Sequence, residues 1–165
     1  MTLKVLVAAI FCLTAVAAAN AQTALTGRVV AISDGDTLTL LDASKVQHRI
    51  RMEGIDAPES GQPFGNRSKQ SLSDLAFNRE ARASCPKTDR YGRRVCQVMV
   101  GGTDIGLEQI RRGMTWHFKR YESEQSEHDR TAYAAAEAEA RRARRGLWAD
   151  ADPVAPWDRR AAKRQ

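Results

Sequence analysis

The stretch from Arg51 to Glu59, R-M-E-G-I-D-A-P-E, constrains the fold more than any other part of the chain. It places one arginine and three carboxylates in a short segment. Gly54 and Pro58 prevent the whole stretch from being a helix interior or a central strand. Two carboxylates 4 Å apart repel each other by about 1 kcal/mol in water and about 4 kcal/mol near a protein surface. The stretch is therefore either a solvated loop or a loop whose acids serve a cation or a substrate proton.

A second acidic turn, D-G-D-T from Asp34 to Thr37, lies upstream and favours the functional interpretation. Alone, an Asp-Gly pair between two strand-like runs predicts only a hairpin turn. Strand-like runs occupy residues 26–32, 37–41 and 46–52. In the third run apolar and polar residues alternate, which puts Arg51 on the polar face just before the acidic loop. Short strands with tight turns predict a meander or a small barrel.

The remainder of the chain predicts three helices and two further strands. We expect helices over residues 66–82, over residues 104–112 and after Ser123 or Ser126, and strands over residues 83–85 and 95–100. Acidic residues begin the last helix and arginines end it, as the helix dipole favours. Its buried side is expected to contain Tyr133, Ala136, Ala140 and Leu147 or Trp148. The fold class is mainly β with helices (α+β).

Residues 1–21 are expected to be a secretory signal peptide. Lys4 precedes an apolar run that ends in Ala19-Asn20-Ala21, which is typical of a cleavage site. The run is short for a membrane span, so that a membrane anchor or a buried helix is the weaker alternative. We therefore expect a secreted or periplasmic protein with no membrane attachment after cleavage.

The mature chain is long enough for one domain, expected at residues 22–150. Residues 151–165 carry two prolines and end in a basic sequence, which predicts a flexible tail. Removal of the leader removes one lysine, so that the net charge falls by one from the +6 of the whole chain. A basic balance suits a polyanionic partner such as nucleic acid. Nothing in the sequence requires an oligomer, and we expect a monomer.

Two cysteines, Cys85 and Cys96, remain after cleavage and flank the turn-like sequence D-R-Y-G-R. In an exported domain an even pair of cysteines favours a disulfide. The two residues would face each other across a hairpin. Two free thiols in a reducing compartment are the alternative.

The acidic and basic residues of these motifs together suit phosphodiester hydrolysis. Asp36, Asp56 and a loop carbonyl near Ala57 offer hard oxygen ligands, which suit Ca²⁺ or Mg²⁺ and not zinc. Glu59 lies close enough in sequence to orient or deprotonate a water. The two guanidiniums of Arg51 and Arg93 come from separate strand ends and would bind a phosphate and stabilise the charge of the transition state.

The order D-G-D-T, R-x-x-G-I-D-A-P-E, D-R-Y-G-R, R-R-G-M-T-W and a long terminal helix resembles the staphylococcal nuclease (thermonuclease) family from about residue 26 to residue 148. The resemblance implies a five-stranded OB-type barrel with three α-helices. It also implies Ca²⁺-dependent endonuclease cleavage of DNA and RNA that leaves 3′-phosphates.

By the same resemblance, the site residues have assigned roles: Asp36 and Asp56 as calcium carboxylates, Ala57 as a main-chain ligand, Glu59 as general base or water-orienting group, and Arg51 and Arg93 as phosphate-binding arginines. The type enzyme has threonine at the position of Ala57, where only a backbone oxygen is needed. The cysteine pair is not part of the type enzyme.

Residues that would contact the rest of the substrate are less sharply defined. Trp116 and Phe118, with Tyr121, are candidates for stacking on a base, and core packing is the equal alternative. Lys87 is a candidate phosphate contact or an ordinary surface lysine.

Two other functions fit part of the pattern. A non-catalytic OB-fold module would bind single strands through a basic groove and stacking aromatics. Such a module gains nothing from Glu59 beside two aspartates, because the carboxylates would repel phosphates. An exported calcium-binding or structural protein would leave Arg51 and Arg93 without a role.

Overall fold

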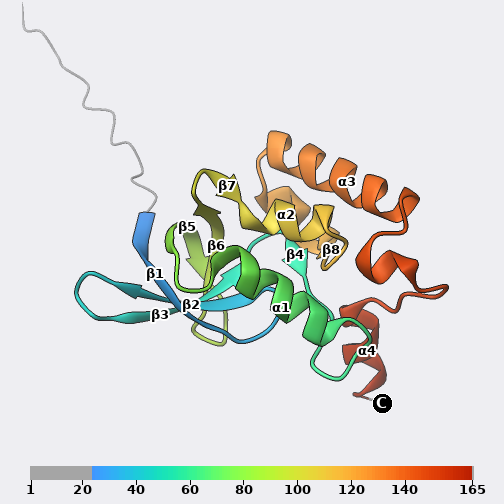
Figure 1. Cartoon of the computed structure of the whole chain (residues 1–165), viewed down its shortest axis with the longest axis horizontal. Coiled ribbons are helices and arrows are strands. Elements are labelled where there is room, and N and C mark those ends of the chain that lie inside the picture. Colours follow the sequence, from blue (N-terminus) through green and yellow to red (C-terminus); the bar gives the residue numbers. More distant parts are fainter. Residues whose placement is uncertain (1–23, 165) are drawn as a thin grey trace, which may run out of the picture.

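The computed structural model describes residues 24–164, and the predicted signal peptide lies outside this part of the chain (Figure 1). The strands are β1 (Ala24–Ile32), β2 (Thr37–Asp42), β3 (Gln47–Met52), β4 (Ile55–Asp56), β5 (Glu80–Thr88), β6 (Arg94–Val100), β7 (Thr103–Asp104) and β8 (Trp116–His117). The helices are α1 (Gly65–Ala76), α2 (Ile105–Arg111), α3 (Glu127–Arg142) and α4 (Pro156–Ala162), with 3₁₀ helices η1 (Lys119–Glu124) and η2 (Gly146–Ala149). Across residues 24–164 none of the helices has the length and apolar character needed to cross a bilayer.

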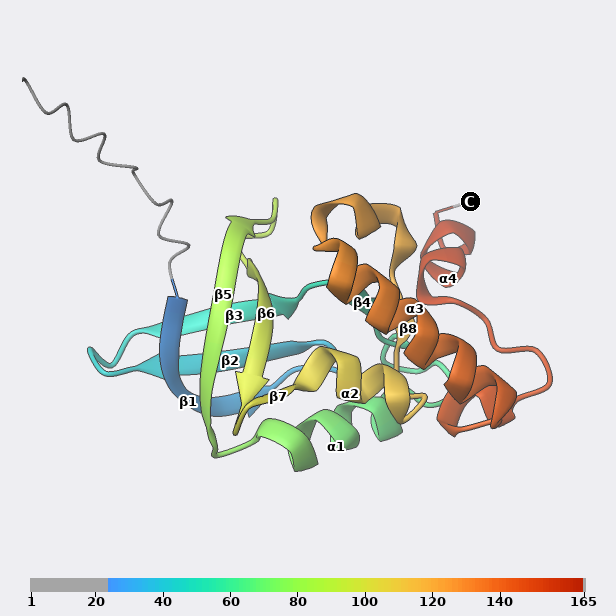
Figure 2. The same cartoon turned by 90° about the horizontal axis from the view of Figure 1, so that it is seen from above.

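Five strands close into a barrel, which occupies one side of the molecule while the helices occupy the other (Figure 2). Antiparallel pairs join β3 to β2, β2 to β1, β1 to β5 and β5 to β6. A parallel pairing of β3 with β6 closes the ring, with Ile50 opposite Arg94 and Met52 opposite Cys96. Fully buried side chains fill the interior, among them Val29, Leu38, Leu40 and Val98. The predicted five-stranded OB-type barrel is confirmed.

The first helix is shorter than the predicted span of residues 66–82, because α1 ends at Ala76. Asn78 has a positive φ of 60°, a conformation that asparagine adopts more readily than most residues. The backbone N–H of Asn78 then donates to the carbonyl of Val29, and the N–H of Val29 donates to the carbonyl of Arg79. Pairing with β1 therefore extends the fourth barrel strand, β5, back to Glu80 from the predicted start at residue 83.

Side-chain caps begin the two helices that follow the barrel. Asp104 accepts hydrogen bonds from the backbone N–H groups at the start of α2, and Ser126 accepts one from Asp129 at the start of α3. The hydroxyl of Tyr133 on α3 donates to Asp104, so that one carboxylate caps α2 and also holds α3. The predicted buried side of α3, with Tyr133, Ala136 and Ala140, is confirmed.

The C-terminal segment differs from the predicted flexible tail, because residues 156–162 form the helix α4. Pro156 begins the helix, where its missing N–H costs nothing. Trp157 stacks on Phe118 at a centroid distance of 5.4 Å and meets Trp116 edge-on at 5.6 Å. These rings come from residues about forty positions upstream, and a tail that packs on them is ordered by tertiary contact.

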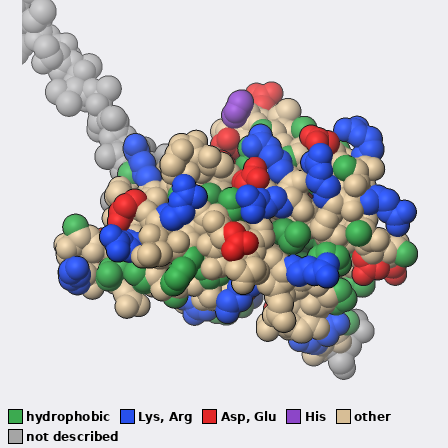
Figure 3. All heavy atoms as spheres, viewed as in Figure 1, with side chains coloured by type: hydrophobic (Ala, Val, Ile, Leu, Met, Phe, Trp, Pro, Cys, Tyr) green, Lys and Arg blue, Asp and Glu red, His purple; other side chains and the backbone are tan. Residues whose placement is uncertain are grey.

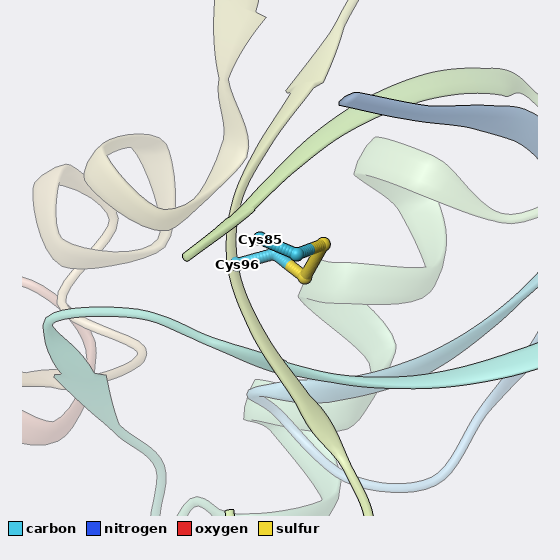
Figure 4. The surroundings of a disulfide bond; sticks show 2 residues. All are labelled: Cys85 and Cys96. Atoms are coloured by element: carbon cyan, nitrogen blue, oxygen red, sulfur yellow. A yellow bond between two sulfur atoms is a disulfide. The ribbon is translucent and has the colours of Figure 1, made fainter. Parts of the chain in front are cut away.

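Cys85 and Cys96 form the predicted disulfide across the hairpin of β5 and β6 (Figure 4). The register of the two strands shifts between Ser84 and Lys87, next to the bridge. Cys96 is fully buried in the core cluster, and Cys85 is partly buried against it. The bridge therefore ties an irregular hairpin directly to the barrel core.

Reduction of this disulfide is expected to destabilise the fold. A loop of about a dozen residues corresponds to about 3 kcal/mol in the loop-entropy description, or about 6–12 °C in Tm for a domain of this size. Calorimetry with and without reductant measures the change. The control is Cys85→Ala/Cys96→Ala, whose Tm should not respond to reductant; an equal Tm for oxidised and reduced wild type would contradict the prediction.

Candidate active site

The first loop of the site is the turn between β1 and β2. The Asp34 carboxylate accepts a hydrogen bond of 3.0 Å from the backbone N–H of Asp36, which shapes the turn. Gly35 has no room for a side chain, since a Cβ would lie 1.8 Å from the hydroxyl oxygen of Ser68 on α1. The amide nitrogen of Gln109 on α2 donates to the carbonyls of both Gly35 and Ser68. The turn is thus pressed against two helices, and this packing buries Asp36.

The second loop leaves the end of β3 and is attached to the first by backbone hydrogen bonds. The N–H of Met52 donates to the carbonyl of Asp36 at 2.8 Å. Gly54 then reverses the chain with a φ of 71°. β4 pairs with β8, which sets Asp56 opposite Trp116 and leaves the aspartate only 2% exposed. The two aspartates that lie twenty residues apart in sequence therefore reach the same end of the barrel.

The guanidinium of Arg51 lies between the two aspartates. Its Nη1 is 3.3 Å from Oδ2 of Asp36, and its Nη2 donates to Oδ1 of Asp56 at 2.9 Å. Nη1 also donates to the carbonyl of Met52, which fixes the orientation of the plane. Burial of a carboxylate is costly without a partner, so the arginine is what makes two buried acids compatible with this packing.

Asp36 has further hydrogen bonds that orient both of its oxygens. Its Oδ2 accepts from the backbone N–H of Ala57 at 2.6 Å, and its Oδ1 accepts from the hydroxyl of Thr37 at 3.0 Å. Burial is the main reason that the pKa of Asp36 is raised to about 7, with Arg51 and the Ala57 N–H acting in the opposite direction. The predicted ligand position Ala57 is thus next to Asp36 in space as well as to Asp56 in sequence.

Glu59 joins the same cluster through an arginine that the sequence reasoning missed. Nη1 of Arg160, on α4, donates to Oε1 of Glu59 at 2.6 Å, and its Nη2 donates to Oδ2 of Asp56 at 2.5 Å. These carboxylates raise the pKa of Arg160 further above its usual value, against the opposite effect of its own burial. The only signal in the sequence was the basic character of the tail, which does not indicate a partner.

Arg93 does not contact the carboxylate cluster. Its Nε donates to Asp89 at 2.7 Å, and the Asp89 carboxylate also accepts from the backbone N–H groups of Tyr91 and Arg93. Although burial opposes the effect, these hydrogen bonds hold the pKa of Asp89 below its usual range. Arg93 directly precedes β6, and the parallel pairing that sets Arg51 opposite Val95 leaves Arg93 two residues before that partner of Arg51. In the structure its guanidinium is bound to its own loop through Asp89.

Of the three candidate substrate contacts, Lys87 lies at the surface near η1. It forms an ion pair with Glu124, and its ammonium lies 5.0 Å from the ring centre of Tyr121. Both members of the pair are about two-fifths exposed, so that solvent screens the interaction. Lys87 is accessible to an anionic ligand that competes with Glu124.

The two aromatic candidates differ in exposure. Trp116 is 7% exposed and belongs to a core cluster with Trp148, which it meets edge-on at 4.3 Å. Phe118 is partly exposed between Tyr121 and Trp157. The structure thus puts Trp116 in the core and leaves Phe118 at the edge of that cluster, under α4.

Two of the arginines at and just beyond the end of α3 are paired with acids on that helix. Arg141 lies 3.6 Å from Glu137, and Arg145 lies 2.8 Å from Glu139. On the face seen in Figure 3, basic side chains are spread out with acidic and apolar ones between them. The ion pairs of Arg141 and Arg145 are in keeping with a solvated helix end.

The donor set at the cluster fits a hard divalent cation, which prefers carboxylate and carbonyl oxygens. Asp36, Asp56 and the carbonyl of Ala57 are the groups that would hold it. Within residues 24–164 no three Asp, Glu, His or Cys side chains converge into a metal site on their own. Guanidiniums of Arg51 and Arg160 are the partners of these oxygens in the structure.

A closed five-stranded barrel whose end carries paired aspartates and an arginine between them defines an OB-fold protein with a candidate anion- and cation-binding site. Residues 49–150 match the family described as staphylococcal nuclease homologue. The chain belongs to this family.

Individual relatives share a similar extent of sequence. A protein of Haemophilus influenzae named "Uncharacterized endonuclease" is 38% identical over 153 residues, which cover 93% of this chain and 83% of the relative. A protein of Shigella flexneri named "Micrococcal nuclease" is 41% identical over 147 residues, which cover 83% and 82%. A "Probable staphylococcal-like nuclease" of Oryza sativa subsp. japonica is 34% identical over 137 residues, but the match covers only 34% of that longer protein.

Replacement of the buried Asp36 is expected to stabilise the fold at high pH. Because its pKa is about 7 in the folded state and 3.8 as a model value, ionisation opposes folding increasingly from about pH 4 to pH 7. Asp36→Asn should therefore match wild type at pH 4 and exceed it at pH 8. The gain has an upper limit of about 4 kcal/mol in the free energy of unfolding.

Urea unfolding at the two pH values, with a chelator present, measures this difference. Asp74→Asn, which removes an exposed carboxylate on α1, is the control for net charge. A variant that is less stable than wild type at pH 8 would contradict the conclusion that burial raises the pKa of Asp36.

Proposed function

We propose that this protein is an exported, Ca²⁺-dependent endonuclease that hydrolyses phosphodiester bonds of DNA and RNA and leaves 3′-phosphates. The observation that carries the proposal is the guanidinium of Arg51 between the buried carboxylates of Asp36 and Asp56. Membership of a family whose relatives are named nucleases supports the same conclusion. A site that holds both an arginine and hard oxygen donors suits a phosphate and a cation together.

The proposed role of Asp36, Asp56 and the Ala57 carbonyl is to hold Ca²⁺. When bound, the cation supplies positive charge beside the phosphate. The buried hydrogen bonds of Asp36 keep its two oxygens in place, so that little reorganisation is needed at the moment of reaction.

Glu59 is proposed to orient or deprotonate the attacking water. It lies at the rim of the cluster, with its side chain about one-third exposed, while both aspartates are buried. A carboxylate at the boundary between the buried acids and solvent is suited to accept a proton from water. To do so it must release Arg160, which it binds in the structure.

Arg51 and Arg93 are proposed to bind the phosphate and to stabilise the negative charge that develops on its oxygens. Arg51 is held by two hydrogen bonds, to the Met52 carbonyl and to Asp56, and by its ion pair with Asp36. Arg93 would exchange its bond to Asp89 for the phosphate, an exchange that its position in a surface loop allows. Lys87, Trp116 and Phe118 remain proposed contacts for the rest of the substrate. Because Trp116 is buried, it would have to become exposed before it could stack on a base.

Export to the periplasm or the exterior is proposed from the predicted leader and agrees with the disulfide, which persists in oxidising compartments. The signal peptide, its cleavage near Ala21 and the monomeric state belong to the same proposal.

Digestion of plasmid DNA and of RNA by the mature chain is expected with Ca²⁺ and not with chelator. Glu59→Gln and Arg93→Ala should each lower kcat by about a hundredfold or more, because each removes a group that acts on the transition state. Arg90→Ala is the matched control, since Arg90 is an exposed arginine on the loop of Arg93 and, like Arg93, lies over the ring of Tyr91. Mass spectrometry of the products should show 3′-phosphate ends.

Two results would contradict the proposal. Wild type that leaves nucleic acid intact in Ca²⁺ would refute the activity. Equal rates for wild type, Glu59→Gln and Arg93→Ala would move the active site elsewhere in the molecule.

A further inference from the structure

The helix α4 lies C-terminal to residues 49–150, which match the family, and it returns to the candidate active site. In Figures 1 and 2 it forms the last helix of the chain and lies on the side of β4 and β8 that faces away from the barrel. Its Arg160 reaches carboxylates more than one hundred residues earlier in the sequence. The helix therefore lies beyond the matched residues and contacts their carboxylates at Asp56 and Glu59.

Arg160 takes the coordination positions that a cation would need. Oδ1 of Asp56 accepts from Arg51 at 2.9 Å, and Oδ2 accepts from Arg160 at 2.5 Å. Both oxygens of Asp56 are thus engaged by guanidiniums. Arg160 also binds Glu59 at 2.6 Å, so that one side chain covers a proposed ligand and the proposed base at once.

The position of Arg160 is supported by contacts elsewhere on its segment. Trp157 lies against Phe118 and Trp116, and the buried Ala155 belongs to the same cluster. The amide of Gln62, in the loop after Glu59, donates to the carbonyl of Val154 at 3.3 Å. The segment is thus docked by aromatic packing that is independent of the charges at the site.

Arg160 can leave Asp56 more easily than Arg51 can. The Arg160 side chain is 36% exposed, whereas that of Arg51 is only 14% exposed. α4 has seven residues, too few to form a stable helix without the surface beneath it. Of the two guanidiniums on Asp56, Arg160 is the one that can leave without opening the barrel.

We propose that α4 is an intramolecular cover of the active site, which Arg160 closes by binding Asp56 and Glu59 and which opens when a divalent cation takes the carboxylates. The cover rests on the function proposed above, because it requires that these carboxylates bind a cation. The closed state satisfies the acids in the absence of cation, and cation binding must displace Arg160 from Asp56.

The test is calorimetric titration of Ca²⁺ alone into the mature chain and three variants of the same chain. Arg160→Ala removes the competing group, and Trp157→Ala loosens the docking while keeping the charge of Arg160. Arg164→Ala is the matched control: it removes an equal charge from the end of the same segment, where the exposed Arg164 side chain donates to the Arg160 carbonyl.

Arg160→Ala is expected to bind Ca²⁺ about tenfold more tightly than wild type, as for a cover that is closed in about nine molecules of ten. Trp157→Ala should shift the Kd in the same direction, and Arg164→Ala should not change it. Hydrogen exchange provides a readout that is independent of affinity. In wild type, the amides of α4 should exchange faster when Ca²⁺ is added, while those of the barrel should not.

The outcomes separate this proposal from the proposed function. An unchanged or weaker affinity in Arg160→Ala, or exchange in α4 that does not respond to bound Ca²⁺, would refute the cover and leave the cation site intact. Equal tightening in Arg160→Ala and Arg164→Ala would reduce the effect to net charge and also refute the cover. Absence of Ca²⁺ binding in all four proteins would refute the cation site itself.

Discussion

The contact of Arg51 with Asp36 and Asp56 is the interaction on which the arrangement of the site depends. Two aspartates buried at one end of a barrel repel each other and lose hydration, and one guanidinium between them offsets part of both costs. A buried ion pair of this kind is weak evidence for stability, because well-packed apolar groups do as well. Its presence in a small barrel is better explained by what a fixed cationic group and two fixed carboxylates can bind.

The barrel holds these groups in position through backbone contacts between its loops. The hydrogen bond from Met52 to Asp36 joins the first loop to the end of β3, and the pairing of β4 with β8 sets the place of Asp56. The parallel pairing of β3 with β6 sets Arg94, the residue after Arg93, opposite Ile50. Functional loops on a rigid scaffold are common, and here the scaffold is the closure of the sheet itself.

Two arginines, Arg93 and Arg160, are each bound to a carboxylate of the chain in the structure. The partner of Arg93 is Asp89, and the partners of Arg160 are Asp56 and Glu59. Such pairs satisfy the charges while substrate and cation are absent. Under the proposed function, ligand binding is an exchange of ionic partners at these two arginines.

Local sequence determined the two acidic turns, most of the barrel strands, the capped helices and the disulfide, because turn chemistry and periodicity act over a few neighbouring residues. Tertiary structure decided the rest. α1 ends at Ala76 because the backbone of Val29 pairs with the residues that follow, and α4 forms because Trp157 finds Phe118 and Trp116. The partner of Arg160 could not be read from the chain, since a charged side chain is placed by whichever distant segments meet around it.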